Sequence, residues 1–314
     1  MAAWWIRPGV RLLAAMVLPF AVPAIITLLI WALPGDPAEI ICPPETCGGT
    51  AELAARWNLD AGPWKFFSGW VNEALTGEFG RSWRVEQGLP VRDLLDESVP
   101  TTLKLVLFAM VPLLLGSAGA ATGVIPARAD GVFAGVGLVP AVVFALLCSA
   151  LVELNYGSSS FSDEANLLRL VLGATVLGLS DGAFSSAVSG VRSLFSSERN
   201  QRYVQIAVLR GEGPLSNMLP NVAPALAGQV RARFLHLLSG TVVVEVVLRI
   251  NGVGDLLWAG TLLQDFGVVL AAATTFACIS AALLVLQACI ELAVALHVRR
   301  SPSVDATASV PAAA

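Results

Sequence analysis

Hydrophobic residues are gathered along this chain into six long runs, and charged residues collect in the segments between them. An α-helix needs about 20 mostly apolar residues to cross the hydrocarbon core of a bilayer. Each run reaches about that length and is therefore predicted to be one transmembrane helix. The approximate ranges are 10–33, 102–125, 131–152, 167–191, 222–248 and 267–296.

The composition supports a location in a membrane. Hydrophobic residues make up 56% of the 314 residues and charged residues only 13%, whereas a soluble domain carries about 25% charge. The net charge of −4 and the scattered lysines and arginines argue against nucleic-acid binding. Two histidines are too few for a histidine-based metal site. The sequence thus predicts an all-α integral membrane protein.

Arginines in the short loops predict how the helices are oriented. Lysine and arginine remain on the cytoplasmic side of short loops, and an internal N-terminus places nearly all loop arginines on that side. The short outer loops then contain mainly acidic residues, with one exception, Arg249. The acidic residues are Asp163, Glu164, Asp255 and Asp265. Both termini are therefore predicted to be cytoplasmic.

A long polar segment separates the first two predicted helices. Within residues 34–100, the stretches 51–58 and 64–76 are predicted to be short amphipathic helices, and the following glycines and prolines indicate turns. With the orientation above, this segment forms a cap on the outer face. Residues 1–300 are predicted to form one domain, and the low-complexity tail 301–314 to be disordered.

Cys42 and Cys47 lie close together at the start of this outer segment. A metal clip would need further ligands, and no histidine or other cysteine is near them in the sequence. An oxidising outer compartment favours a local disulfide. The disulfide is the preferred interpretation, and the metal clip is the alternative.

The cytoplasmic segment 192–221 contains the most informative pattern. Residues 199–210 are predicted to form a short amphipathic helix with Tyr203, Ala207 and Arg210 near one face. Gly211 provides the flexible backbone typical of a helix C-terminus.

A second short segment is predicted to begin at Pro214, and Leu219 and Pro220 lead into the fifth span. Two short helices on the inner surface would suit the docking of a cytosolic partner. The alternative is an interfacial loop without a partner.

The stretch Tyr203-Val204-Gln205-Ile206-Ala207-Val208-Leu209-Arg210-Gly211 resembles the coupling loop of ABC-importer permeases, in which Ala-x-x-x-Gly precedes Leu-Pro. It is most similar to the dipeptide/oligopeptide and nickel branch, and to the first (B-type) permease of that branch. Further stretches resemble this branch in the same order along the chain. They are Leu33-Pro34-Gly35-Asp36-Pro37, Gly77-Glu78-Phe79-Gly80-Arg81-Ser82, and Gly240 to Glu245 followed by residues 251–254. Pro220 follows Gly211 more closely than in the family, which implies a shorter coupling helix.

The resemblance implies a type I ABC importer permease fold with an extracytoplasmic insertion after the first helix. It also implies a bacterial inner-membrane location and several partners: a second homologous permease, two ATPase subunits and an external substrate-binding protein. No Gly-x-x-x-x-Gly-Lys-Ser/Thr loop occurs in the sequence. ATP and magnesium are therefore expected on the ATPase subunits, with no cofactor and no enzymatic activity on this chain.

Five ionisable residues fall inside predicted spans: Asp181, Arg231, Arg233, His236 and Glu245. Charges within a membrane are costly, so they usually face protein or a water-filled cavity. The functional interpretation places Arg231, Arg233 and Glu245 along a translocation pathway, with the arginines attracting a substrate carboxylate. The alternative is that each arginine pairs with a neighbouring helix or extends to the membrane surface. Asp181 is expected to make a polar contact between helices.

Other classes of function remain as alternatives. A self-sufficient secondary transporter would be expected to show internal repeats, and none is visible. An intramembrane enzyme would need a recognisable catalytic motif, and neither Gly-x-Ser-x-Gly nor His-Glu-x-x-His occurs. Within the ABC family, nickel chelates are the alternative to peptides as substrate.

Overall fold

The computed structural model describes residues 6–41, 49–56, 59–157 and 162–300. These residues form helices joined by short connections, with no β-structure beyond one isolated bridge between Arg81 and Pro90. Four helices are long and apolar enough to cross a membrane, and the number rises to six when each of two sharply bent helix pairs counts as one span. The predicted all-α fold with six spans is therefore confirmed.

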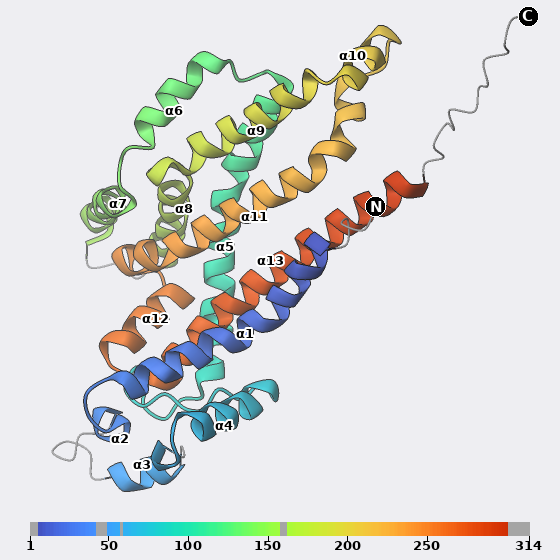
Figure 1. Ribbon diagram of the computed structural model, residues 1–314. Helices are drawn as coiled ribbons and strands as arrows, with labels where there is room; N and C mark the ends of the chain where they lie inside the picture. Colours follow the sequence, from blue (N-terminus) through green and yellow to red (C-terminus); the bar gives the residue numbers. More distant parts are fainter. Residues whose placement is uncertain (1–5, 42–48, 57–58, 158–161, 301–314) are drawn as a thin grey trace, which may run out of the picture.

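The first and last spans, α1 (Ile6–Ala32) and α13 (Phe266–Arg300), lie side by side along most of their length (Figure 1). An ion pair between Arg11 on α1 and Glu291 on α13 joins the two helices. Large apolar side chains cover much of the remaining surface of α1 and are exposed. Such a surface is suited to contact with lipid.

The segment that follows α1 forms a small helical cap at one end of the bundle (Figure 1). Phe66 and Trp70 are buried in it, and they pack in one cluster with Ile30 of α1 and Leu270 of α13. Burial of these large side chains fixes the cap to the ends of the two spans. The cap elements are α2 (Pro37–Ile41), α3 (Thr50–Arg56), η1 (Leu59–Ala61) and α4 (Pro63–Leu75).

The second span, α5 (Val91–Thr122), begins well before its predicted start at residue 102. The sequence pattern was misleading because the first turns of α5 are polar and Pro100 follows them. Val91 and Leu95 in these turns are buried against Val268 of α13 and neighbouring residues. Packing against α13 and against α12 (Val253–Leu262) therefore extends the helix through a proline that would weaken an isolated helix.

Three spans are broken within their length, and the first two breaks lie in the third and fourth spans. α6 (Asp130–Val136), which follows η2 (Ala127–Ala129), and α7 (Ala141–Tyr156) meet at an angle of 72°, so the prediction of one continuous helix over 131–152 is wrong. α8 (Asp163–Leu179) and α9 (Ala183–Arg199) are separated by η4 (Ser180–Gly182).

The two breaks contact each other. The backbone amide of Asp181 donates to the carbonyl of Val139 at 3.3 Å, and its carboxylate accepts from the amide of Ala141, at the first turn of α7, at 3.3 Å. A Cβ on Gly137 would lie only 2.7 Å from the Cα of Gly182. Backbone groups freed by one break are thus satisfied by the other, as a membrane interior requires, and the polar contact expected of Asp181 is present.

The chain then forms one short helix and two more spans: α10 (Arg202–Leu209), α11 (Pro214–Leu248) with α12 (Val253–Leu262) at an angle of 71°, and α13. The predicted second short helix at Pro214 is wrong, because α11 is continuous from Pro214. Pro214 occupies the first position of the helix, where a proline costs no hydrogen bond. Pro220 and Pro224 lie farther inside the helix.

The centre of the bundle is formed by α5, α7, α8, α9 and α11. Glycines on facing surfaces bring these helices close together, as is typical of membrane helices. A Cβ on Gly173 would meet Leu105 and Val244 at 3.1 and 3.2 Å, and one on Gly240 would meet Leu177 at 2.9 Å. This tightly packed centre holds the ends of the bundle at fixed positions.

Candidate coupling site and transport pathway

The short helix α10 lies at the end of the bundle opposite the cap (Figure 1). Val204 and Ala207, three residues apart, are both buried, and Val204 packs with Phe195 of α9 and Met218 of α11. Residues at this spacing share one face of a helix. One face of α10 is therefore anchored to two spans, and the opposite face is left open.

Gly211 ends α10 in a left-handed conformation, with φ of 79°. Its amide donates to the carbonyl of Val208 at 3.0 Å, and the amide of Glu212 donates to the carbonyl of Ala207 at 3.0 Å. This is the Schellman pattern, in which glycine is preferred because a side chain is strained at positive φ. Nothing lies within 4 Å of a Cβ built on Gly211, so the turn is also open to an approaching protein.

Apolar side chains are exposed on α10 and on the first turns of α11. Leu209 is 86% exposed, and four further apolar residues are between 41% and 53% exposed. Exposed apolar groups gathered at one place are typical of a protein interaction surface. We call this surface the coupling face; it comprises Ile206, Val208, Leu209, Leu215 and Leu219.

Tyr203 lies beside this face and donates a hydrogen bond to the carboxylate of Glu198 at the end of α9. Partial burial raises the pKa of the Tyr203 hydroxyl, and the hydrogen bond to Glu198 raises it further. The hydroxyl therefore remains protonated and links α10 to α9. Arg202 and Arg210, at the two ends of α10, are exposed.

The six residues predicted from the sequence for coupling are close together in the chain and lie at this end of the molecule. Ala207 is buried and Pro220 is half-buried, while the other four are exposed. Ala207 and Pro220 therefore support the exposed surface from within the protein. Tyr203, Arg210, Gly211 and Leu219 are accessible.

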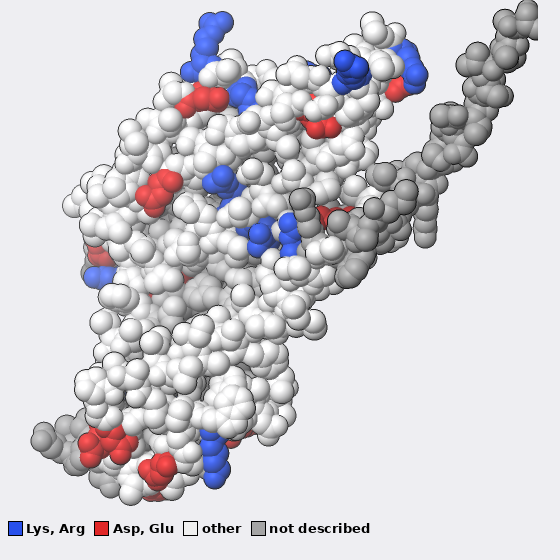
Figure 2. Space-filling model, viewed as in Figure 1, with Lys and Arg blue, Asp and Glu red and all other residues white. Residues whose placement is uncertain are grey.

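Charged side chains gather at the two ends of the molecule, and the wide region between them is mostly uncharged (Figure 2). A few basic side chains interrupt this region on the face shown. Arg231 and Arg233, both on α11, are half-buried, and the structure shows no ion pair for either among the residues it describes. The Nε atoms of both arginines are buried without a hydrogen-bond partner among those residues.

Arg233 contacts the neighbouring helix α9. Its Nη1 donates to the hydroxyl of Ser186 at 2.6 Å, and its Nη2 approaches the Ser186 carbonyl at 3.5 Å. The same arginine lines a groove of about 290 Å³ between α5, α9 and α11, which is otherwise mostly apolar. Gln229 and Ser117 are the other polar residues of the groove. An anionic group in this groove would find the guanidinium of Arg233 as its main partner.

Glu245 occupies a different environment, at the junction of α5, α11 and α12. It is fully buried, and its carboxylate accepts from the hydroxyl of Thr102 at 2.7 Å and from the amides of Gly254 and Asp255 at 2.7 and 3.1 Å. The amide of Val253 donates to Thr102 at 2.8 Å. The carboxylate thus caps the N-terminus of α12, where a negative charge is stabilised. The position of Glu245 indicates a supporting role between these helices.

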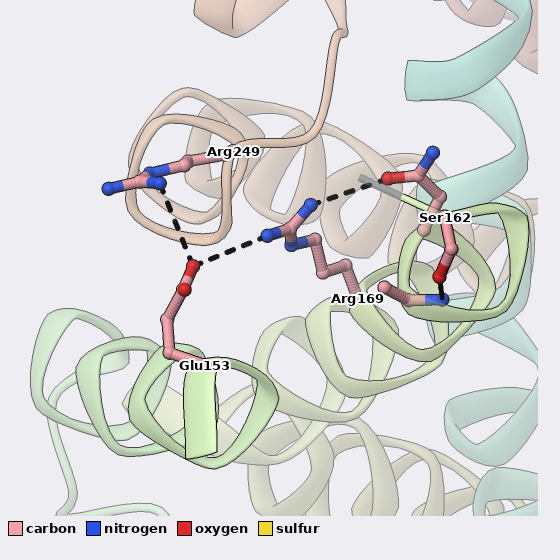
Figure 3. Close-up of polar contacts among 6 residues, drawn as sticks. Glu153, Ser162, Arg169 and Arg249 are labelled. Carbon is pink, nitrogen blue, oxygen red and sulfur yellow. Dashed lines mark hydrogen bonds and ion pairs between the residues drawn. The ribbon is translucent and has the colours of Figure 1, made fainter. Parts of the chain in front are cut away.

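A second polar cluster, which the sequence analysis did not identify, joins α7, α8 and the end of α11 (Figure 3). Arg169 is only 2% exposed, and it and Arg249 both point toward the carboxylate of Glu153, at 3.4 and 3.6 Å. The Nη1 of Arg169 also donates to Asn166 at 3.3 Å. The sign of this cluster in the sequence was Arg169, a charged residue near the start of the predicted apolar run 167–191.

Cys42 and Cys47 lie outside the residues that the structure describes, so their pairing stays a prediction. Among the described residues, no group of three or more His, Cys, Asp or Glu side chains could hold a metal ion.

Comparison with known proteins agrees with this architecture. The chain is 26% identical over 291 residues to the "Probable peptide ABC transporter permease protein y4tP" of Sinorhizobium fredii, covering 83% of this chain and 90% of that protein. It is also 26% identical over 273 residues to the "Glutathione transport system permease protein GsiC" of Escherichia coli strain K12, covering 82% of this chain and 87% of that protein.

A family match covers most of the helical bundle. Residues 108–300, more than half of the chain, match the family described as "Binding-protein-dependent transport system inner membrane component". The matched range includes α10 and all of α11, α12 and α13. The chain is therefore a member of this family, a multi-pass permease subunit of a binding-protein-dependent ABC transport system.

Proposed function

We propose that this permease forms half of a pathway for importing short peptides, and that ATPase subunits dock on its coupling face. The named relatives support the substrate class, since one is described as a peptide permease and the other as a glutathione permease. Glutathione is itself a tripeptide. A second permease subunit would form the other half of the pathway, and an external binding protein would deliver the peptide.

The observation that carries the proposal is the exposed apolar surface of α10 beside its glycine turn. Leu209 is 86% exposed at a site far from the cap and next to exposed arginines. A leucine in this position gains about 1.5–3 kcal/mol when a partner buries it. Because Val204 and Ala207 anchor the other face of α10 to α9 and α11, a force on this helix is transmitted directly to two spans.

The orientation follows from the distribution of arginines. The connections at the α10 end of the bundle contain Arg128, Arg199, Arg202 and Arg210, and this end is proposed to be cytoplasmic. The cap and the Glu153 cluster then lie on the outer side. ATP binding and hydrolysis take place on the separate ATPase subunits, and this chain contributes no cofactor site.

The groove lined by Arg233 is the proposed part of the pathway on this chain. Arg231 and Arg233 provide positive charge for the C-terminal carboxylate of a peptide, and the apolar walls from α5 and α9 accommodate its side chains. Glu245 acts on the pathway through the position of α12. The two contacting breaks, between α6 and α7 and between α8 and α9, are points at which these helices can pivot when the ATPases close.

The test is to replace Leu209 with aspartate and purify the transporter in mild detergent. We expect Leu209→Asp to lose the ATPase subunits during purification, while the second permease remains bound, because a charge in a buried apolar contact is strongly unfavourable. Peptide uptake into vesicles should fall in parallel. Leu75→Asp is the matched control, because Leu75 is 72% exposed at the end of α4 in the cap.

Two results would contradict the proposal. If the ATPases are recovered with Leu209→Asp as well as with the wild type, α10 is not their docking site. A chain that purifies alone and moves solute in ATP-free vesicles under an ion gradient would be a secondary transporter.

A further inference from the structure

A cavity of about 470 Å³ lies in the cap, remote from the groove that lines the proposed pathway. It is enclosed by α4, by the loop over residues 77–83 and by the first residues of α5. Cavities of about 300–1,000 Å³ are the usual size for small-molecule sites in proteins. Nothing in the coupling mechanism uses this space.

One wall of the cavity is aromatic. Phe66, Trp70 and Phe79 line it, and the rings of Trp70 and Phe79 are 6.2 Å apart between centroids. Trp70 is only 8% exposed, and its indole N–H has no hydrogen-bond partner among the residues that the structure describes. Because that N–H is buried, this wall offers a ligand an apolar aromatic surface.

The cavity also has acidic residues in its lining. Glu73, Glu78 and Asp93 line it, and none of them forms an ion pair within the described part of the chain. The two arginines at the rim are engaged elsewhere. Arg81 donates to the carbonyl of Gly88 at 2.8 Å, and Arg92 lies 3.7 Å from Asp96. The lining therefore combines aromatic rings with three carboxylates and two guanidinium groups, so that the carboxylates outnumber the cationic groups by one.

We propose that this cap cavity binds the amino-terminal end of a short peptide. The ammonium group is held by the three carboxylates, and an apolar side chain stacks on Phe66, Trp70 and Phe79. Cations are attracted both to carboxylates and to the faces of aromatic rings. This inference rests on the proposed function, which places the cap on the side where peptide arrives.

The cavity gives the permease a recognition site of its own, in addition to that of the external binding protein. It selects for a free amino terminus, whereas Arg233 in the groove selects for a free carboxyl terminus. A peptide that is released close to the cap would be retained there instead of diffusing away.

The test uses the complete transporter in nanodiscs, without binding protein and without ATP. Equilibrium dialysis measures binding of the dipeptide phenylalanyl-alanine and of its N-acetylated form. We expect the free dipeptide to bind at least about tenfold more tightly than the acetylated one. The double variant Glu73→Gln/Glu78→Gln should lose this preference. The control Glu52→Gln/Glu97→Gln removes the same amount of charge from exposed sites outside the cavity. This control should keep the preference for the free dipeptide.

Several outcomes would overturn the inference. One is equal binding of the two dipeptides by the wild type, and another is equal binding of the free dipeptide by the wild type and the cavity variant. A third is a cavity variant that binds the external binding protein more weakly, when the transporter alone binds no free dipeptide. ATP-driven uptake of the dipeptide by the complete system, with binding protein, separates the two proposals. Uptake without cap binding would overturn the cap site alone, and absence of uptake would also remove peptides as the substrate.

Discussion

Glu245 shows how a charged side chain is accommodated inside this membrane protein. Its carboxylate receives one hydroxyl and two backbone hydrogen bonds and faces the N-terminus of α12. Close approach of the backbone makes this possible, because a Cβ on Gly252 would lie 2.3 Å from the Glu245 carboxyl carbon. The glutamate and the two glycines, Gly252 and Gly254, therefore form one unit, and their joint occurrence in the sequence reflects packing.

Replacing Gly254 with alanine should destabilise the protein through this unit. The added Cβ would lie 2.6 Å from the Cα of Val242 and 2.8 Å from Glu245 Oε2. Overpacking of this kind costs about 1–3 kcal/mol, so we expect thermal unfolding in detergent to shift down by several degrees. Gly131→Ala is the control, because nothing lies within 4 Å of its Cβ. Equal unfolding temperatures for the two variants would show that α12 can move away without loss.

At the scale of elements, apolar run length predicted the six spans and an amphipathic pattern predicted the short helix α10, but neither predicted the breaks. Hydropathy reports how many residues can lie in a membrane, whereas helix direction depends on tertiary contacts. The bend between α6 and α7 is stabilised by Asp181, which is 40 residues away from Ala141 in the sequence. No local pattern indicates such a partner.

For the same reason, some residues of the candidate sites could be predicted from the sequence and others could not. The residues proposed for coupling could be named from the sequence because they are contiguous in the chain. The Glu153 cluster combines residues that are distant in sequence, and the cap cavity combines three segments within residues 66–93. Neither has a local pattern. Arg231 and Arg233 were visible as charges in an apolar run, but the contact with Ser186 was not.

Besides the apolar cluster that contains Phe66 and Trp70, one buried carboxylate attaches the cap to the bundle: Asp265, just before α13. Its Oδ2 accepts from the hydroxyl of Ser82 at 2.7 Å and from the amides of Trp83 and Arg84 at 2.8 and 3.0 Å. Its Oδ1 lies 3.4 Å from the amide of Val268 in the first turn of α13. The acid thus connects the cap loop to the start of the last span.

Asp265→Ala should loosen the cap while leaving the spans intact. Hydrogen bonds to a charged group contribute about 1.5–3 kcal/mol each, and buried amides left without an acceptor add a further cost. We expect limited proteolysis to cleave within residues 77–90 much faster than in the wild type, with cut sites identified by mass spectrometry. Glu97→Ala, which removes an exposed carboxylate on α5, should not change the cleavage rate. A wild-type rate for Asp265→Ala would mean that the apolar cap cluster alone holds the loop.

At the scale of the whole molecule, the chain has two polar ends and a mostly uncharged middle (Figure 2). Two of the charged residues in the middle are informative because neither forms an ion pair within the described part of the chain. Arg11 on α1 has Glu291 on α13, but Arg231 and Arg233 on α11 have no carboxylate among the described residues. A permease that forms half of a pathway is expected to leave such groups for the substrate or for the other half.

Replacing Arg233 with glutamine distinguishes a substrate contact from a purely structural arginine. Glutamine retains a donor for Ser186 but removes the charge that a peptide carboxylate would meet in the groove. If Arg233 contacts the substrate, uptake of a free dipeptide should fall about tenfold, which corresponds to about 1.4 kcal/mol. Uptake of the same dipeptide with an amidated C-terminus should be unchanged. Arg128→Gln, an exposed arginine between α5 and α6, is the control and should affect neither peptide. An equal loss for both peptides would assign Arg233 to the packing of α9 against α11, and the source of substrate specificity would then lie in the other permease or in the binding protein.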